Sequence, residues 1–322
     1  MGAVHLYLIR HGESVDNVAN LYSALFVGVA RVCSAGSRDA PLTNHGVLQA
    51  KRLGEHLATR TAAAPAPITH VFSSNLQRAH RTAMLVAPVS STPSLQTGNA
   101  DALASSSSDV GRTASTVGVI PLQLAELREK HFGTGEGQRF GARSSGDRHE
   151  DAEDHDSMRV RAERFVDEYL APLFACVEGE RDEEQEGASS GTESIIIVAH
   201  GIILGVLTRV LLAAGNFGSL ATGTPDQQQH FSWSNTGYLL IHVKTMPPAV
   251  DAKESAAGSR GGTQDAKWPH LKLEIVEVNC TDHLCGLKKT RGGIGSAKFD
   301  EKQKTLSAFF KPTVSKRKHE DS

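Results

Sequence analysis

The sequence has few cysteines and no long apolar run. Only four of its 322 residues are cysteine, which argues against a disulfide framework and fits a reducing cytosolic or nuclear setting. No stretch approaches the roughly 20 apolar residues that a membrane span needs, so no membrane partner is expected. The first residues also lack the charged region and apolar run of a signal peptide, and they read as a strand instead.

The net charge is unevenly spread along the chain. Residues 286–322 hold ten Lys or Arg and four Asp or Glu, a charge of +6. Since the formal net charge is −2, the rest of the chain carries −8. A basic tail on an acidic body is typical of an appended interaction segment. We therefore expect a catalytic domain over residues 1–285 and a disordered basic tail over 286–322.

Strand-like and helix-like segments alternate along the first 280 residues. Apolar runs predict strands at 4–10, 68–74, 119–124, 194–199, 237–244 and 271–279. Helical periodicity or flanking signals predict helices at 43–60, 76–87, 156–176 and 202–214, with Pro172 ending or kinking the third of these. Such alternation predicts an α/β domain with a largely parallel sheet.

Three insertions interrupt this pattern, near residues 88–117, 178–193 and 246–266. They are rich in small, polar or acidic residues and have too few apolar residues to build a core. We expect them to be surface loops.

Five motifs follow one another in a recognisable order. They are Arg10-His11-Gly12 with Asn17; Leu42-Thr43 with Gly46, Gln49, Ala50 and Leu53-Gly54; Ser73 to Ala79 around Arg78, with Thr82; Leu127-Arg128-Glu129 with Gly133, Glu136 and Gly137; and Val198-Ala199-His200-Gly201. In these motifs the chain resembles the histidine phosphatase superfamily, which includes the cofactor-dependent phosphoglycerate mutases. The resemblance covers about residues 4–244 and implies a three-layer α/β/α fold.

The residue types suit phosphoryl transfer, because fixed positive groups must receive the charge that spreads over the phosphate oxygens. The planar forks of Arg10 and Arg78 can each hold two oxygens. His200, if protonated, and Asn17 add donors, and Gly201 joins them as a phosphate-binding residue by resemblance. His11 is the expected nucleophile, since a neutral imidazole attacks well near neutral pH. Because these residues follow predicted strands, they can meet at one sheet edge.

Two assignments have close competitors in the sequence. Glu129 is the expected general acid, but Glu126 lies one helical turn away; the family spacing of acid, three residues and glycine favours Glu129. Arg81 competes with Arg78, and the Leu-x-Arg-Ala pattern favours Arg78.

Metal binding is not expected from the sequence. Cys280, His283 and Cys285 lie close together, but three ligands at this spacing, with no second pair, make a poor tetrahedral zinc set. We expect neither a metal nor a cofactor.

Three functions fit the motifs. The favoured one is a phosphatase acting on a phosphorylated small molecule or a phosphoprotein. The second is a mutase of the phosphoglycerate type, although the first loop (residues 13–17) lacks the Trp of the mutases. The third is a non-catalytic interaction protein on a phosphatase fold, which the presence of all five expected catalytic residues disfavours.

The tail carries a motif of its own. Gln303, Leu306, Phe309 and Phe310 have the spacing of the PIP box, the motif that binds the DNA sliding clamp (proliferating cell nuclear antigen). A single turn of 3₁₀ or α helix would bring Leu306, Phe309 and Phe310 to one side as an apolar plug. Lys316-Arg317-Lys318 resembles a weak nuclear import signal. The sequence has no motif for direct nucleic-acid binding, and we expect the protein in the nucleus, the cytoplasm or both.

Overall fold

The computed structural model describes residues 3–19, 36–63, 66–87, 119–138, 149–179, 192–213, 217–221, 231–246, 267–289 and 293–301. Its strands are β1 (Ala3–Arg10), β2 (Ile68–Ser74), β3 (Leu122–Leu124), β4 (Thr192–Ala199), β5 (Phe217–Ala221), β6 (Tyr238–Thr245) and β7 (Trp268–Cys280). Its α-helices are α1 (Val15–Val18), α2 (Asn44–Ala63), α3 (Gln77–Val86), α4 (His155–Phe165), α5 (Ala171–Gly179) and α6 (Gly201–Leu211). Shorter turns are η1 (Ala125–Leu127), η2 (Gly133–Gly135), η3 (Val166–Leu170), η4 (Asp282–Leu284) and η5 (Ile294–Ser296).

One seven-stranded sheet forms the centre of the molecule, in the order β3-β2-β4-β1-β6-β7-β5. Strands β3, β2, β4 and β1 are parallel to their neighbours within this group, whereas β6 is antiparallel to both β1 and β7. The carboxyl ends of β1, β2 and β4 therefore meet at one edge of the sheet. The predicted α/β class with a largely parallel sheet is confirmed.

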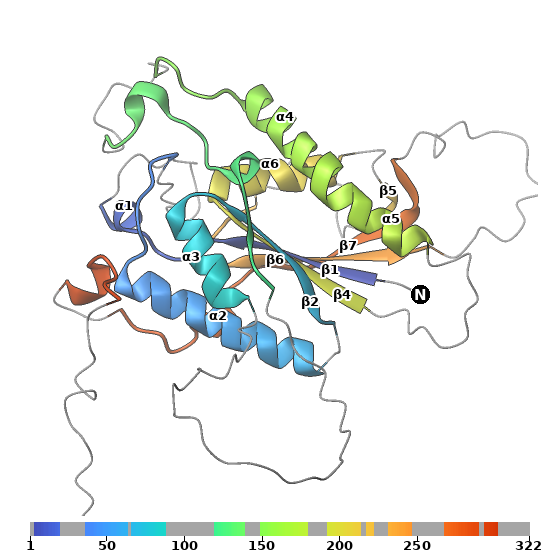
Figure 1. The fold of residues 1–322 in the computed structure, drawn as a ribbon, viewed down its shortest axis with the longest axis horizontal. Coiled ribbons are helices and arrows are strands. Elements are labelled where there is room, and N and C mark those ends of the chain that lie inside the picture. Colours follow the sequence, from blue (N-terminus) through green and yellow to red (C-terminus); the bar gives the residue numbers. More distant parts are fainter. Residues whose placement is uncertain are drawn as a thin grey trace, which may run out of the picture.

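Helices cover both faces of this sheet (Figure 1). Strand β1 shows why, because its side chains are buried on both alternations. Leu6 and Leu8 pack in the cluster that includes α4, α5 and α6, and Tyr7 and Ile9 pack with α2 and α3 on the other face. Burying one such large apolar side chain contributes about 1.5–3 kcal/mol. The three-layer α/β/α arrangement implied by the resemblance is thus the observed one.

Several predicted elements match closely. The predicted strand 68–74 coincides with β2, and the predicted helix 43–60 is α2 with a longer C-terminal end. Thr43 was expected to cap α2, and its Oγ1 accepts the N–H of Gly46 at 3.0 Å. The predicted helix 156–176 is α4, η3 and α5 in succession, and η3 is a π-helical turn. This turn ends two residues before Pro172, which has no N–H for a helical hydrogen bond and whose ring crowds the preceding turn of an α-helix.

Other elements differ from the prediction. Strand β3 is three residues long, rather than the six predicted at 119–124, and the short strand β5 was not predicted. Residues 88–118, 180–191 and 247–266, which hold most of the three expected insertions, lie outside the described residues. Among the helices that the structure describes, none has the length and apolar character of a membrane span.

The boundary of the predicted tail is corrected by the structure. Within 293–301, the carbonyl of Ile294 accepts Nδ2 of Asn44 at 2.9 Å, and the N–H of Phe299 donates to the carbonyl of Leu42 at 3.1 Å. This segment packs on the body because it completes hydrogen bonds at the start of α2. The clamp-binding-like motif at 303–310 lies outside the described residues.

Candidate active site

Arg10 and His11 lie at the carboxyl end of β1, where the loop at residues 233–237 contacts Arg10. The N–H of His11 donates to the carbonyl of Ala199 on β4 at 3.0 Å. Nη1 of Arg10 donates to the carbonyl of Trp233 at 2.6 Å, and the N–H of Thr236 donates to the carbonyl of Arg10 at 3.0 Å. Both side chains are buried. Their positions are therefore fixed by backbone groups on two sides.

The His11 ring is oriented by its own loop. Nδ1 lies 2.7 Å from the carbonyl of Gly12, so we assign the proton to Nδ1 and the lone pair to Nε2. Burial, followed by the charges of Arg78 and Arg10, holds the pKa of His11 well below its usual value. The ring is therefore neutral at physiological pH, which is the form that can act as a nucleophile.

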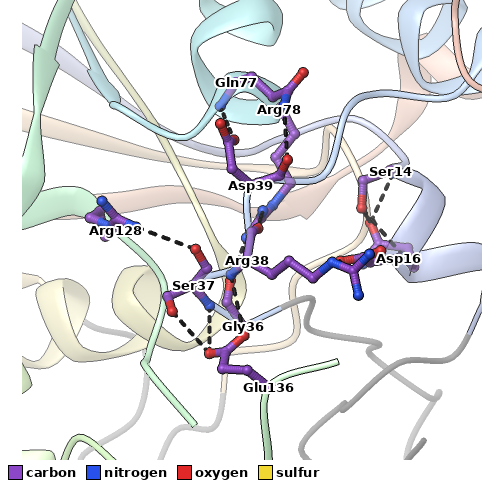
Figure 2. A network of polar contacts seen from close by, with 11 residues as sticks. Ser14, Asp16, Gly36, Ser37, Arg38, Asp39, Gln77, Arg78, Arg128 and Glu136 are labelled. Carbon is purple, nitrogen blue, oxygen red and sulfur yellow. Dashed lines mark hydrogen bonds and ion pairs between the residues drawn. The ribbon is translucent and has the colours of Figure 1, made fainter. Parts of the chain in front are cut away.

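Arg78 lies in the first turn of α3, directly after β2, and is fully buried. Its Nε donates to Nε2 of His11 at 3.2 Å, and its Nη2 donates to the carbonyl of Gly36 at 2.6 Å. Nη1 donates to the carbonyl of Arg38 (Figure 2). Burial lowers the pKa of Arg78 to about 10, with Glu129 and then Asp16 opposing the shift. The guanidinium consequently stays charged at neutral pH.

His200 lies between β4 and α6, with its ring centre 4.9 Å from that of His11. It has no exposed surface, and neither ring nitrogen has a hydrogen-bond partner among the described residues. Burial lowers the pKa of His200 well below its usual value, and Arg78 adds to this effect. His200 is thus neutral in this state, and its role as a cationic donor would require the added charge of a phosphate. Gly201 begins α6 beside it.

Asn17 lies in α1 and is linked to the same loop as Arg10. Its Oδ1 accepts the N–H and the hydroxyl of Ser14, both at 3.0 Å, and Nδ2 of Asn235 at 3.3 Å. Asn235 also donates to the carbonyl of His11 at 3.1 Å. These bonds place Asn17 next to the backbone of the expected nucleophile.

The structure separates the two candidate acids. Glu129 is 2% exposed and accepts the N–H groups of Ile202 and Ile203, at 3.1 and 3.2 Å, at the start of α6. Its charge also acts on Arg78. Glu126 instead lies 4.0 Å from Arg164 on α4. Glu129, and not Glu126, therefore lies among the other candidate residues.

Sequence reasoning missed several residues of this site. Trp233, Asn235 and Thr236 hold the end of β1, and Asn235-Thr236-Gly237, directly before β6, is a turn signal that could have marked them. Gly36 and Arg38 contribute backbone carbonyls, which have no signature in a sequence.

The cysteine–histidine group near the end of β7 lies apart from these residues. His283 is buried, and its Nε2 lies 2.9 Å from Oγ1 of Thr236. Within the described ranges, no three His, Cys, Asp or Glu side chains are arranged to hold a metal ion. His283 therefore helps to hold the 233–237 loop through its contact with Thr236.

Taken together, the site brings two guanidinium groups, two neutral imidazoles and a carboxylate to one edge of the sheet. The guanidinium groups can hold an anion, and the lone pair of His11 can attack an electrophile held there. The carboxylate of Glu129 can exchange a proton with a leaving group. This combination suits the displacement of a group from phosphorus.

Comparison with known proteins finds relatives of this chain. Residues 6–99 match the model of the histidine phosphatase superfamily (branch 1). A probable phosphatase of Schizosaccharomyces pombe is 28% identical over 310 residues, which are 94% of this chain and 78% of that protein.

Two bacterial relatives match over shorter stretches. An adenosylcobalamin/alpha-ribazole phosphatase of Salmonella typhi is 40% identical over 90 residues, 28% of this chain and 36% of that protein. A 2,3-bisphosphoglycerate-dependent phosphoglycerate mutase of Lactobacillus johnsonii is 38% identical over 86 residues, 27% of this chain and 31% of that protein. The comparisons thus support the histidine phosphatase superfamily, with homologues of both phosphatase and mutase type.

Proposed function

We propose that this protein is a phosphatase that hydrolyses phosphomonoesters through a phosphohistidine on His11. The observation that carries the proposal is the buried, neutral ring of His11, with its Nε2 3.2 Å from Nε of Arg78. A nucleophile and a phosphate-binding cation in direct contact are what an attack on a bound phosphoryl group requires.

In the first step, Nε2 of His11 attacks phosphorus and the bond to the ester oxygen breaks. Arg10 and Arg78 receive the charge on the equatorial oxygens, and Asn17, His200 and Gly201 complete the phosphate site. Glu129 gives its proton to the departing oxygen, so that an alcohol leaves.

In the second step, Glu129 takes a proton from water as the water oxygen attacks phosphorus. The nitrogen–phosphorus bond breaks, and the electron pair returns to Nε2 of His11. Inorganic phosphate leaves, and Glu129 is protonated again for the next cycle.

Trapping the intermediate tests this mechanism. The wild-type protein, quenched in acid during turnover of a labelled aryl phosphate, should yield an acid-labile protein-bound phosphate. His11→Ala should yield none and should lose turnover, whereas His155→Ala, at an exposed histidine of α4, should behave as the wild type. Undiminished turnover by His11→Ala would refute the proposal.

A mutase of the phosphoglycerate type is the second candidate, and the Lactobacillus relative favours it. A screen over sugar phosphates, nucleotides and phosphopeptides separates the possibilities. Release of inorganic phosphate supports a phosphatase, and bisphosphate-dependent transfer between hydroxyls supports a mutase. Absence of both activities on every compound of the panel supports a non-catalytic interaction protein.

We also propose that Gln303, Leu306, Phe309 and Phe310 dock on the DNA sliding clamp. The motif pattern and its basic flanks support this, since lysines steer a tail toward an acidic surface. Two aromatic anchors can give most of the binding energy of a short segment. Because a clamp partner requires nuclear entry, we propose that Lys316-Arg317-Lys318 serves import.

Calorimetry with the full-length protein tests the docking. We expect a Kd in the micromolar range, equivalent to about −8 kcal/mol. Phe309→Ala combined with Phe310→Ala should abolish binding without changing phosphatase rates, and Val314→Ala, outside the motif, should leave binding intact. Absence of binding by the wild type at high clamp concentration would refute the docking proposal.

A further inference from the structure

The segment Gly36–Asp39 lies against the guanidinium of Arg78, as Figure 2 shows. The carbonyls of Gly36 and Arg38 accept two of its N–H groups, one from each terminal nitrogen. Because the third bond goes to His11, this short segment fixes the direction in which the fork of Arg78 faces. Anything that fixes the segment consequently fixes the phosphate-binding group.

One carboxylate holds the segment in place. Oε1 of Glu136 accepts the N–H of Ser37 at 2.9 Å and its hydroxyl at 3.0 Å, and Oε2 accepts the N–H of Arg38 at 3.2 Å. Charge-assisted bonds of this kind are stronger than bonds between neutral groups. Glu136 thereby binds the peptide unit between Gly36 and Ser37, whose carbonyl holds Arg78, and the N–H of Arg38, whose own carbonyl also holds Arg78.

The same carboxylate also belongs to the loop that carries the candidate acid. Oε1 of Glu136 accepts the N–H of Phe132 at 2.9 Å, and Phe132 is three residues from Glu129. A second link runs from Nη2 of Arg128 to the carbonyl of Ser37, at 3.3 Å. The phosphate-binding arginine and the acid loop are therefore joined through Glu136.

The close fit at Gly36 supports a specific role for this contact. Gly36 has a φ of +57°, which a residue with a Cβ rarely adopts, and a Cβ there would lie 2.6 Å from Oε2 of Glu136. The far end of the segment is anchored separately, since Oδ1 of Asp39 accepts the N–H of Gln77 at 2.7 Å.

We propose that Glu136 is a positioning residue of the phosphate site. Its carboxylate fixes the backbone of residues 36–38, and this backbone aims the guanidinium of Arg78 at the phosphate that His11 attacks. The inference rests on the proposed function for the identity of the anion. Glu136 itself is not assigned any contact with substrate.

Equilibrium binding of orthovanadate, a phosphate analogue, tests the inference without turnover. Glu136→Gln keeps the size of the side chain but turns an amide N–H toward the N–H of Arg38. We expect the Kd for vanadate to rise about tenfold or more, the usual consequence of losing bonds to a charged group. Ser37→Ala, which loses one of the bonds, should raise it about two- to threefold. Glu163→Gln, at a surface ion pair of α4, is the matched control.

Kinetics distinguish positioning from a general loss of structure. A positioning defect raises KM for an aryl phosphate and the Kd for vanadate together, while the number of titratable sites stays that of the wild type. A merely unstable variant shows fewer binding sites with an unchanged Kd. A folded Glu136→Gln protein with the Kd of the wild type overturns the inference. If Glu136→Gln does not fold, an unchanged Kd in both Ser37→Ala and Gly36→Ala overturns it.

These outcomes are separable from failure of the proposed function. A wild type that binds vanadate but hydrolyses no ester refutes the phosphatase, while the ratio of Kd values still decides the role of Glu136. A wild type that does not bind vanadate overturns both.

Discussion

The side chains of His11 and Arg78 are joined by a hydrogen bond from Nε of the arginine to Nε2 of the histidine, at 3.2 Å. The lone pair assigned to nucleophilic attack is therefore occupied in this state. A phosphoryl group that reaches the site must come between the two side chains and replace this bond with its own oxygens. The arginine then changes from a partner of the nucleophile into a partner of the substrate.

We expect that lysine cannot replace Arg78 in catalysis, because an ammonium group lacks the planar fork of a guanidinium. Arg78→Lys keeps the charge but loses the planar fork that can hold two phosphate oxygens side by side, so kcat/KM should fall by about 10²–10³. Arg81→Lys is the control, because Arg81 is only partly buried and pairs with Glu301. Steady-state kinetics on an aryl phosphate measure both. A drop of less than about threefold in Arg78→Lys would contradict the role given to the fork.

Glu129 should matter most when the leaving group is poor. Glu129→Gln should lower kcat for an alkyl phosphate by about 10²–10⁴ and that for a nitrophenyl phosphate much less, because only the alkoxide needs a proton. The control is Glu126→Gln, whose carboxyl lies near Arg164. Equal losses on both substrates would mean that Glu129 orients the site and is not the acid. The selective pattern in Glu126→Gln would reverse the assignment.

His283 should make the stability depend on pH. Burial, followed by the charge of His56, lowers its pKa to about 4 in the folded state, against an ordinary value near 6.5. Between these pH values the unfolded chain binds a proton at His283 that the folded protein does not bind. The contribution of His283 to the free energy of unfolding is therefore fully present above pH 6.5 and is lost as the pH falls toward 4.

Thermal unfolding at several pH values between 7.5 and 4 measures this effect. Between pH 7.5 and pH 4, the Tm of His283→Gln should fall by at least about 2 °C less than the Tm of the wild type. His131→Gln, at an exposed position, should follow the wild type. Parallel curves for all three proteins would show that His283 does not contribute to the pH dependence.

Residues 293–301 should stabilise the catalytic domain. A chain ended after Thr290 loses the bonds from the N–H and Nδ2 of Asn44 and from the N–H of Phe299. At about 1 kcal/mol each, their loss should lower Tm by several degrees. A chain ended after Glu301 keeps them and is the control. Equal Tm values would show that the segment contributes nothing to stability.

The sequence predicted those parts of the molecule whose signals are local. Strand β2 and the cap at Thr43 follow from a buried apolar run and a hydroxyl before a helical stripe. His11 and Arg78 were predicted to meet because parallel strands end at one edge. Residue type alone could not separate Glu126 from Glu129; this needed the family spacing, and the structure now places Glu129 beside α6.

The remaining features depend on long-range geometry. The contacts of Gly36 and Arg38 with Arg78 are made by carbonyls, which every residue has, so no pattern identifies them. The link between Glu136 and Ser37 spans 99 positions in the chain, so no local pattern in the sequence predicts it. Strand β5 is short, and it was missed because five residues offer too little periodicity.

The hydrogen bond from the N–H of Phe299 to the carbonyl of Leu42 sets the length of the connection between the catalytic domain and the proposed docking motif. Gln303 follows four residues later, and four residues span at most about 14 Å. A partner that bound the proposed docking motif would therefore hold the catalytic domain close to its own surface and restrict the motion of the domain. A tether of this length would confine the candidate active site to a small volume around such a partner, and this would favour substrates presented on the same assembly.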